Sequence, residues 1–250
     1  MHTIDQTKPP RRDAAENRIA ILESARLLLN RDPEASLEAI AAGAGLSRRS
    51  IYGHFATRDE LVTEIQTLGG QRVTAALAHV DHVDSRVAIA LIGARLWSEV
   101  ENVRVMAQLA VRGPQRAAMA DTLRPVREKL RSIVERGIAA RELRTDVAPT
   151  TLANLIEGAA LSVLDEAIRA DLSNEEGHRL VMLATLATAG LSWHEASAVI
   201  VHHPELQFVE APARGETEPP RAPAPLQSPD ASHETRDRTA ASTRTSGAPS

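Results

Sequence analysis

Residues 21–61 read ILESARLLLNRDPEASLEAIAAGAGLSRRSIYGHFATRDEL and hold the clearest helical pattern of this chain. Its first part repeats apolar residues at steps of three and four, which predicts an amphipathic helix. Two short helices follow, at residues 37–42 and 47–55. Gly43-Ala44-Gly45 separates them, because glycine tolerates the left-handed conformation of a tight turn. Short helices joined by a glycine turn predict a helix-turn-helix.

Residues that begin and end helices support this interpretation. Asp32-Pro33 ends the first helix, since proline cannot continue it. Ser36 and Ser47 stand where a hydroxyl can accept an otherwise unpaired backbone N–H of the first turn. Thr57 precedes Glu60 by three residues, the spacing of a capping box, and opens a fourth helix.

The composition favours an all-α fold. Apolar residues make up 43% of the 250, but only five are aromatic, so aliphatic side chains that suit helices build the core. The absence of cysteine excludes disulfides, thiolate zinc sites and a cysteine nucleophile. No signal-peptide pattern and no apolar run of membrane-spanning length occur, so we expect a cytoplasmic protein without a membrane partner.

The pattern divides the chain into five parts. Residues 1–12 are a flexible basic arm, 13–60 the helix-turn-helix domain and 61–195 a helical ligand-binding and dimerisation domain. Residues 196–210 stay unassigned, and 211–250 hold seven of the fourteen prolines, which predicts a disordered tail. In the body we predict helices at residues 85–100, 103–112, 114–141, 149–170 and 174–191, with Gly69-Gly70 weakening the one before them.

Residues 21–61 resemble the N-terminal signature of TetR-family repressors. The resemblance lies in the alanine-rich second helix, Ala44-Gly45-Leu46-Ser47, and Tyr52-Gly53-His54-Phe55 followed by a basic residue and a leucine. It implies a nine-helix, all-α dimer whose third helix enters the major groove and whose last two helices pair with a partner. Family members often carry glycine at the position of Arg49 and a charge at that of Gly43, so the operator cannot be transferred from a relative.

Positive charge is concentrated where such a domain reads DNA. The net charge of −4 argues against a non-specific nucleic-acid coat, but Arg48, Arg49 and Arg58 carry the only formal charges of residues 43–58. We expect Arg48 and Arg49 to include the main base reader, because arginine donates two hydrogen bonds to guanine. The full predicted DNA-binding set is Ser36, Ser47, Arg48, Arg49, Ser50, Tyr52, His54 and Arg58.

Ser36, Ser47, Tyr52, His54 and Arg58 suit another role on this surface. Hydroxyls, an imidazole and a cation near helix N-termini suit phosphate contacts, which fix register without reading sequence. The alternative to DNA binding is that residues 47–58 form an ordinary solvated helix with exposed arginines. Lys8, Arg11 and Arg12 could reach a minor groove or form a solvated tail.

A two-fold dimer would double the small interface of one helix-turn-helix with double-stranded DNA. We predict its seam on two apolar helices, and the alternative is that these residues form an intramolecular core. The predicted seam residues are Leu152, Leu155, Ile156, Ala159, Val163, Leu180, Leu183, Ala184, Ala187 and Leu191.

A small-molecule effector would bind among the helices of residues 85–141. Large or adaptable apolar side chains line such pockets, although helical spacing makes each of them equally a core residue. The candidates are Trp97, Met106, Leu109 and Met119.

No metal or cofactor is expected. His79 and His82 are three residues apart, as metal ligands on a helix are, yet no pattern of groups that would orient such ligands accompanies them, nor does one accompany His202-His203. The sequence contains no phosphate-loop or hydrolase motif that would indicate an enzyme. The sequence thus predicts a dimeric regulator, most simply a repressor released from a palindromic operator by a ligand. The alternative is a small-molecule-binding helical protein that no longer binds DNA.

Overall fold

The computed structural model describes residues 10–101, 103–113 and 116–209, without the side chains of residues 10–12, 112, 116 and 118. The chain divides into two units, residues 1–210 and 211–250, and everything described below belongs to the first. The predicted basic arm before residue 10 and the predicted tail lie outside the described residues.

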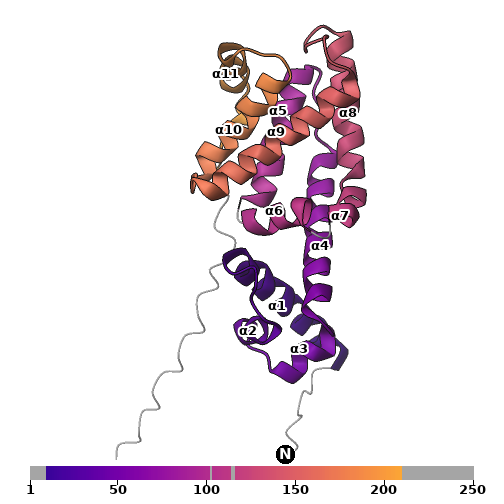
Figure 1. Cartoon of the computed structure of the whole chain (residues 1–250), viewed down its shortest axis with the longest axis vertical. Helices are drawn as coiled ribbons and strands as arrows, with labels where there is room; N and C mark the ends of the chain where they lie inside the picture. The colour runs from indigo at the N-terminus through magenta and orange to yellow at the C-terminus, as the bar shows by residue number, and fades with distance from the viewer. Residues whose placement is uncertain (1–9, 102, 114–115, 210–250) are drawn as a thin grey trace, which may run out of the picture. The chain divides into compact units, whose positions relative to one another are not determined.

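Four helices build the N-terminal part: α1 (Pro10–Arg31), α2 (Leu37–Gly43), α3 (Arg48–His54) and the first turns of α4 (Arg58–Ala78) (Figure 1). Helix α1 begins at Pro10 rather than at residue 13, which suits proline because its missing N–H would be unpaired in a first turn. The helices enclose an apolar cluster that includes the fully buried Ile21, Ile51 and Phe55.

The predicted caps are confirmed. The hydroxyls of Ser36 and Ser47 accept the N–H groups of Ala39 and Ser50, each at 3.2 Å. Thr57 likewise accepts the N–H of Glu60 at 3.2 Å. The predicted capping box is incomplete there, since the Glu60 carboxylate accepts the N–H of Ala56, one residue before the cap.

Glycine has two separate roles between α2 and α3. Gly45 has a φ of +69°, the left-handed conformation that the predicted turn requires. Gly43 is a packing residue, because a Cβ there would lie 2.5 Å from the hydroxyl oxygen of Ser24. That hydroxyl donates to the carbonyl of Ile40 at 2.9 Å and joins α1 to α2. A charged side chain at position 43 would displace this contact.

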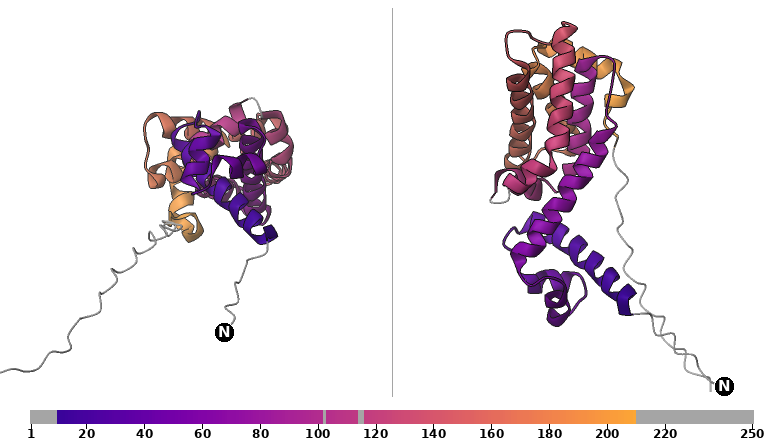
Figure 2. Two further views of the ribbon diagram at one scale, coloured as in Figure 1. Left: turned by 90° about the horizontal axis from the view of Figure 1, so that it is seen from below. Right: turned by 90° about the vertical axis from the view of Figure 1, so that its right-hand side faces the viewer.

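The body contains α5 (Ser85–Val100), α6 (Arg104–Arg112), α7 (Arg116–Thr122), α8 (Arg124–Ala139), α9 (Pro149–Arg169), α10 (Asn174–Thr188), α11 (Trp193–His202) and a 3₁₀ turn, η1 (Pro204–Leu206). Helix α10 packs against α5 and α9 around a second apolar cluster. Helix α4 continues without interruption through Gly69-Gly70 and runs from the N-terminal helices into the body (Figure 2).

Three expectations about the body are corrected. The single helix predicted over residues 114–141 is two helices, because Pro125 in the first turn of α8 cannot continue the preceding helix. The described residues hold eleven α-helices, not the nine that the resemblance implied. The unassigned residues 196–210 contain most of α11, which begins at a capping box of Ser192 and Glu195.

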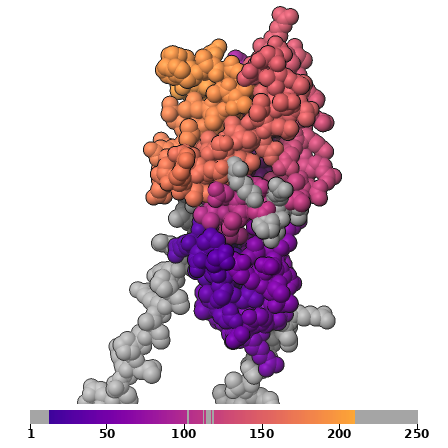
Figure 3. Space-filling view, viewed as in Figure 1, coloured from indigo at the N-terminus to yellow at the C-terminus, as the bar shows by residue number. Residues whose placement is uncertain are grey.

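Side chains fill the spaces that the ribbon leaves between helices on the face seen in the space-filling view (Figure 3). In the part of the chain that the structure describes, no helix is both long and apolar enough to cross a membrane.

Candidate nucleic-acid interface and ligand cavity

The N-terminal turn of α3 presents two arginines to solvent. Ser47 caps this turn, and Arg48 and Arg49 follow it directly, both exposed. The side chain of Arg48 is 74% exposed although it forms an ion pair. Arg49 is exposed and contributes no ion pair within the described residues. A guanidinium at this place can reach base edges when a recognition helix enters the major groove.

Glu38 of α2 organises this surface, and the sequence patterns did not single it out. Its Oε1 accepts a hydrogen bond from the Tyr52 hydroxyl at 2.9 Å and pairs with Arg48 Nε at 3.2 Å. The Arg48 guanidinium also lies 5.6 Å from the centre of the Tyr52 ring. The backbone N–H of Glu38 itself, followed by the Tyr52 hydroxyl, lowers the pKa of Glu38, so this carboxylate is charged at neutral pH.

Arg58, a member of the predicted DNA-binding set, also forms hydrogen bonds within the protein. Its Nε donates to the carbonyl of Ala35 at 3.0 Å, and its Nη2 donates to the carbonyl of Pro33. The guanidinium therefore braces the α1–α2 loop against α4. A phosphate contact by Arg58 stays a prediction, because its remaining N–H groups can still donate.

The other residues of the predicted DNA-binding set lie at the starts of α2 and α3 or along α3. Ser36 and Ser47 are exposed, and a hydroxyl that accepts an N–H can still donate its proton to a phosphate. Ser50 is half-buried and supplies the N–H that Ser47 accepts. His54 is half-buried at the far end of α3, where its carbonyl accepts from Arg18 at 3.4 Å.

Two capped short helices, a left-handed glycine turn and exposed arginines at the start of the second helix together form a helix-turn-helix. Residues 21–65 match the family model described as bacterial regulatory proteins, tetR family. Residues 21–65 therefore form a TetR-type N-terminal domain. The fold of the chain and its N-terminal domain are those of TetR-family DNA-binding transcription regulators.

Solved structures of TetR-family and similar proteins share this fold. PfmR from Thermus thermophilus is 23% identical, with a TM-score of 0.56 over 70% of this chain and 97% of that one. SmeT from Stenotrophomonas maltophilia is 21% identical, with a TM-score of 0.54 over 69% and 91%. FadR from Bacillus subtilis is 16% identical, with a TM-score of 0.57 over 69% and 98%. No protein of curated function matches the chain in sequence.

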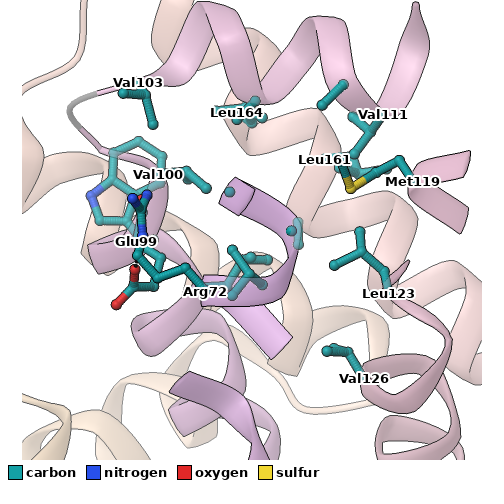
Figure 4. Close-up of a pocket in the computed structure, with 18 of the residues that line it drawn as sticks. Arg72, Glu99, Val100, Val103, Val111, Met119, Leu123, Val126, Leu161 and Leu164 are labelled. Atoms are coloured by element: carbon teal, nitrogen blue, oxygen red, sulfur yellow. Dashed lines mark hydrogen bonds and ion pairs between the residues drawn. The ribbon is translucent and has the colours of Figure 1, made fainter. Parts of the chain in front are cut away.

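The TetR-type body encloses a cavity of about 250 Å³ (Figure 4). Its described wall is mostly apolar and draws on α1 and on α4 to α10. Trp97, Met106 and Met119, predicted as ligand contacts, line it; Leu109 does not, and packs instead against the N-terminal apolar cluster. Direct contact of these side chains with a ligand stays a prediction.

The charged groups on the described cavity wall were not predicted, and they occur in pairs. Arg72 Nε lies 2.7 Å from a carboxylate oxygen of Glu99, and Arg127 holds both oxygens of Glu157 at 2.7 to 2.9 Å. Hydrogen bonding to Glu157 raises the pKa of Arg127. The third pair joins neighbouring turns of α1, Arg26 to Glu23, at 3.1 Å.

The predicted dimer seam separates into an inward and an outward face. Three of its residues are buried in the core of this chain, as in the intramolecular alternative, and cannot contact a partner. These are Leu152, Ile156 and Val163. The remaining residues are half-buried or exposed, and two of their leucines are exposed, Leu155 by 50% and Leu180 by 37%. The outward set is Leu155, Ala159, Leu180, Leu183, Ala184, Ala187 and Leu191. Leu183, Ala184 and Leu191 are only half-buried but also pack against the core of this chain.

The fold brings together one histidine from each of the two pairs noted in the sequence, together with a glutamate. Ligand atoms of His82, His203 and Glu205 lie within 4.8 Å of one another, whereas His79 and His202 are outside this group. Glu205 is exposed and the two rings are half-buried. Three such ligands could hold a divalent cation only with water completing the coordination.

Proposed function

We propose that this chain is a dimeric, sequence-specific DNA-binding regulator, a repressor that leaves a palindromic operator when a small molecule fills the cavity of its body. The observation that carries the proposal is the capped start of α3, where Arg48 and Arg49 project into solvent. Arginine at that position of a recognition helix pairs with guanine, and each such pair contributes about 1–3 kcal/mol of discrimination.

Shared residues support a link between the cavity and the DNA-binding domain. Leu22 of α1, Ile65 of α4 and Met106 of α6 line the cavity and also belong to the N-terminal apolar cluster or pack against it. A ligand that shifts these helices changes the spacing of two DNA-binding domains in a dimer. A coupling of about 1–3 kcal/mol is typical for such effects.

The outward face of α9 and α10 supports dimerisation. Large apolar side chains such as Leu155 and Leu180 gain free energy when a second copy covers them, and small residues beside them allow close helix approach. A two-fold dimer places its DNA-binding domains on half-sites separated by about one helical turn or a multiple of it.

Related structures agree with this class of function. SmeT is described as the repressor of a multidrug efflux pump, and FadR was solved in complex with stearoyl-CoA. Because both are less than 25% identical to this chain, neither its operator nor its ligand follows from them.

The second candidate is a ligand-binding protein that no longer binds DNA. The exposed Arg49 guanidinium argues against it, because Arg49 forms no ion pair with any described residue and is free to contact DNA.

The test is selection of duplexes from a random DNA library by the purified chain at low salt. We expect a palindrome to be enriched, with two copies of the chain bound per duplex. A folded protein that enriches no sequence would contradict DNA recognition and favour the second candidate.

A further inference from the structure

The side chain of Gln66 is an isolated polar group on the wall of the cavity. It lies in the middle of α4 and is only 6% exposed. Its amide oxygen is buried and has no hydrogen-bond partner among the described residues. A buried amide oxygen without a partner is destabilising, so native proteins rarely keep one without a use for it.

The neighbouring polar side chains on the described wall form no hydrogen bond with the Gln66 oxygen. The six charged side chains form the three ion pairs of Arg26, Arg72 and Arg127 with glutamates. The hydroxyl of Thr185 donates to carbonyls of its own helix, those of Val181 and Met182, at 2.8 and 3.0 Å. The described lining therefore has no net charge, and Gln66 is its one side chain with an orphaned buried polar atom.

The size of the cavity limits what can meet Gln66. A volume of about 250 Å³ exceeds the roughly 150 Å³ that holds benzene in an apolar protein cavity. It is slightly below the roughly 300–1,000 Å³ of sites for drug-sized ligands. A compact molecule with one substituted ring, or a chain of similar volume, fits.

We propose that the effector is a neutral, mainly apolar molecule with one hydrogen-bond donor, and that Gln66 is the residue that recognises the donor. This inference rests on the proposed ligand-sensing function and adds its chemical class. An apolar wall favours an apolar ligand body through burial of its surface. The donor pairs with the Gln66 oxygen, while a carboxylate would meet arginines whose charge glutamates already neutralise.

Three probes of one shape separate these properties: 4-butylphenol carries a donor, butylbenzene carries none, and 4-butylbenzoate is an anion at pH 7.5. Their dissociation constants are measured by isothermal titration calorimetry. We expect wild type to bind the phenol about tenfold more tightly than butylbenzene, the range of one net hydrogen bond, and to bind the benzoate most weakly.

The variant Gln66→Leu replaces the amide with an apolar group of similar size. It is expected to fold, to unfold at a higher temperature than wild type, and to bind phenol and butylbenzene within twofold of each other. The matched control is Gln71→Leu, five residues further along α4, exposed and outside the described cavity wall, which keeps the tenfold preference.

The remaining outcomes distinguish a failure of Gln66 to recognise the donor from a failure of the chain to bind a ligand. Equal binding of phenol and butylbenzene by wild type, a preference that survives in Gln66→Leu, or tightest binding of the benzoate overturns the role of Gln66 but leaves a ligand site. Failure of the folded wild type to bind any of the three overturns this inference and the proposed ligand sensing together.

Discussion

Gly177 of α10 shows how a single missing side chain shapes the body. A Cβ at this position would lie 2.0 Å from the ring of Trp97, whose indole N–H donates to the Asn174 carbonyl at 2.9 Å. We predict that Gly177→Ala lowers the free energy of unfolding by about 1–3 kcal/mol, as overpacking does. Urea denaturation followed by circular dichroism measures it.

The control for Gly177 is Gly69→Ala in α4, where a Cβ would meet no atom of the described residues within 4 Å. Alanine in a helix interior is about 0.5–1 kcal/mol more favourable than glycine, so this variant should gain stability. Equal effects of the two substitutions would show that helix propensity alone acts at both sites.

His178, also in α10, makes stability depend on pH. It is 6% exposed, and burial lowers the pKa of its imidazole below the usual 6.5. The folded protein thus keeps His178 neutral while the unfolded chain takes up a proton. Its contribution is complete above about pH 6.5 and is lost as pH falls through the lowered pKa.

We therefore predict that His178→Gln reduces the loss of unfolding free energy between pH 7.5 and pH 5.5. The exposed His79→Gln serves as the control and should lose as much as wild type. Urea denaturation at the two pH values measures both. A loss in His178→Gln equal to that of wild type would mean that His178 is not buried in the neutral form.

At the scale of helices, Asn30 joins the DNA-binding domain to the body. It lies in the last turn of α1, and its Oδ1 accepts the N–H groups of Val105 and Met106 at 3.0 and 3.4 Å. Helix α6 has no cap from its own Val103. Asn30 thus caps a helix that lies 75 residues further along the chain.

Removal of this cap should weaken the connection between α1 of the DNA-binding domain and α6 of the body. We predict that Asn30→Ala costs about 0.5–2 kcal/mol of unfolding free energy, the usual cost of a lost N-cap. Asn30→Asp should retain stability, because a carboxylate accepts the same N–H groups and suits the positive end of a helix. If aspartate destabilised as much as alanine, the capping bonds would not be the source of the effect.

Local signals in the sequence were sufficient for most helices. Ser36, Ser47 and Gly45 act within a few residues of their position, so pattern alone located α2, α3 and the turn. Pro125 and the Ser192 capping box were also local signals. The continuous helical pattern of residues 114–141 and the β-branched residues 199–201 obscured them.

The functional surfaces depend on contacts that no local pattern contains. Glu38 meets Arg48 and Tyr52 only because α2 and α3 cross, and Gln66 becomes a cavity residue only once the other helices of the cavity wall surround α4. The split of the predicted dimer seam follows from how α9 rotates against α10, which turns Leu152 inward and Leu155 outward.

At the scale of the whole molecule, the outward face of α9 and α10 should hold two copies together. We predict that Leu155→Arg converts the dimer to a monomer, measured by analytical ultracentrifugation, and weakens binding to a palindromic duplex. Leu27→Arg, at a side chain 52% exposed in α1, keeps the dimer. A dimer that survives Leu155→Arg would place the interface elsewhere.

The central claim is that α3 reads DNA sequence, and a specificity ratio tests it most directly. Fluorescence anisotropy would give the dissociation constants of wild type and Arg49→Ala for a selected palindrome and for the same duplex with one guanine per half-site replaced. We predict that wild type prefers the palindrome by at least about tenfold, the equivalent of about 1.4 kcal/mol, and that Arg49→Ala loses most of this preference at one position. An unchanged ratio in Arg49→Ala, and likewise in Arg48→Ala, would contradict sequence reading by this turn of α3.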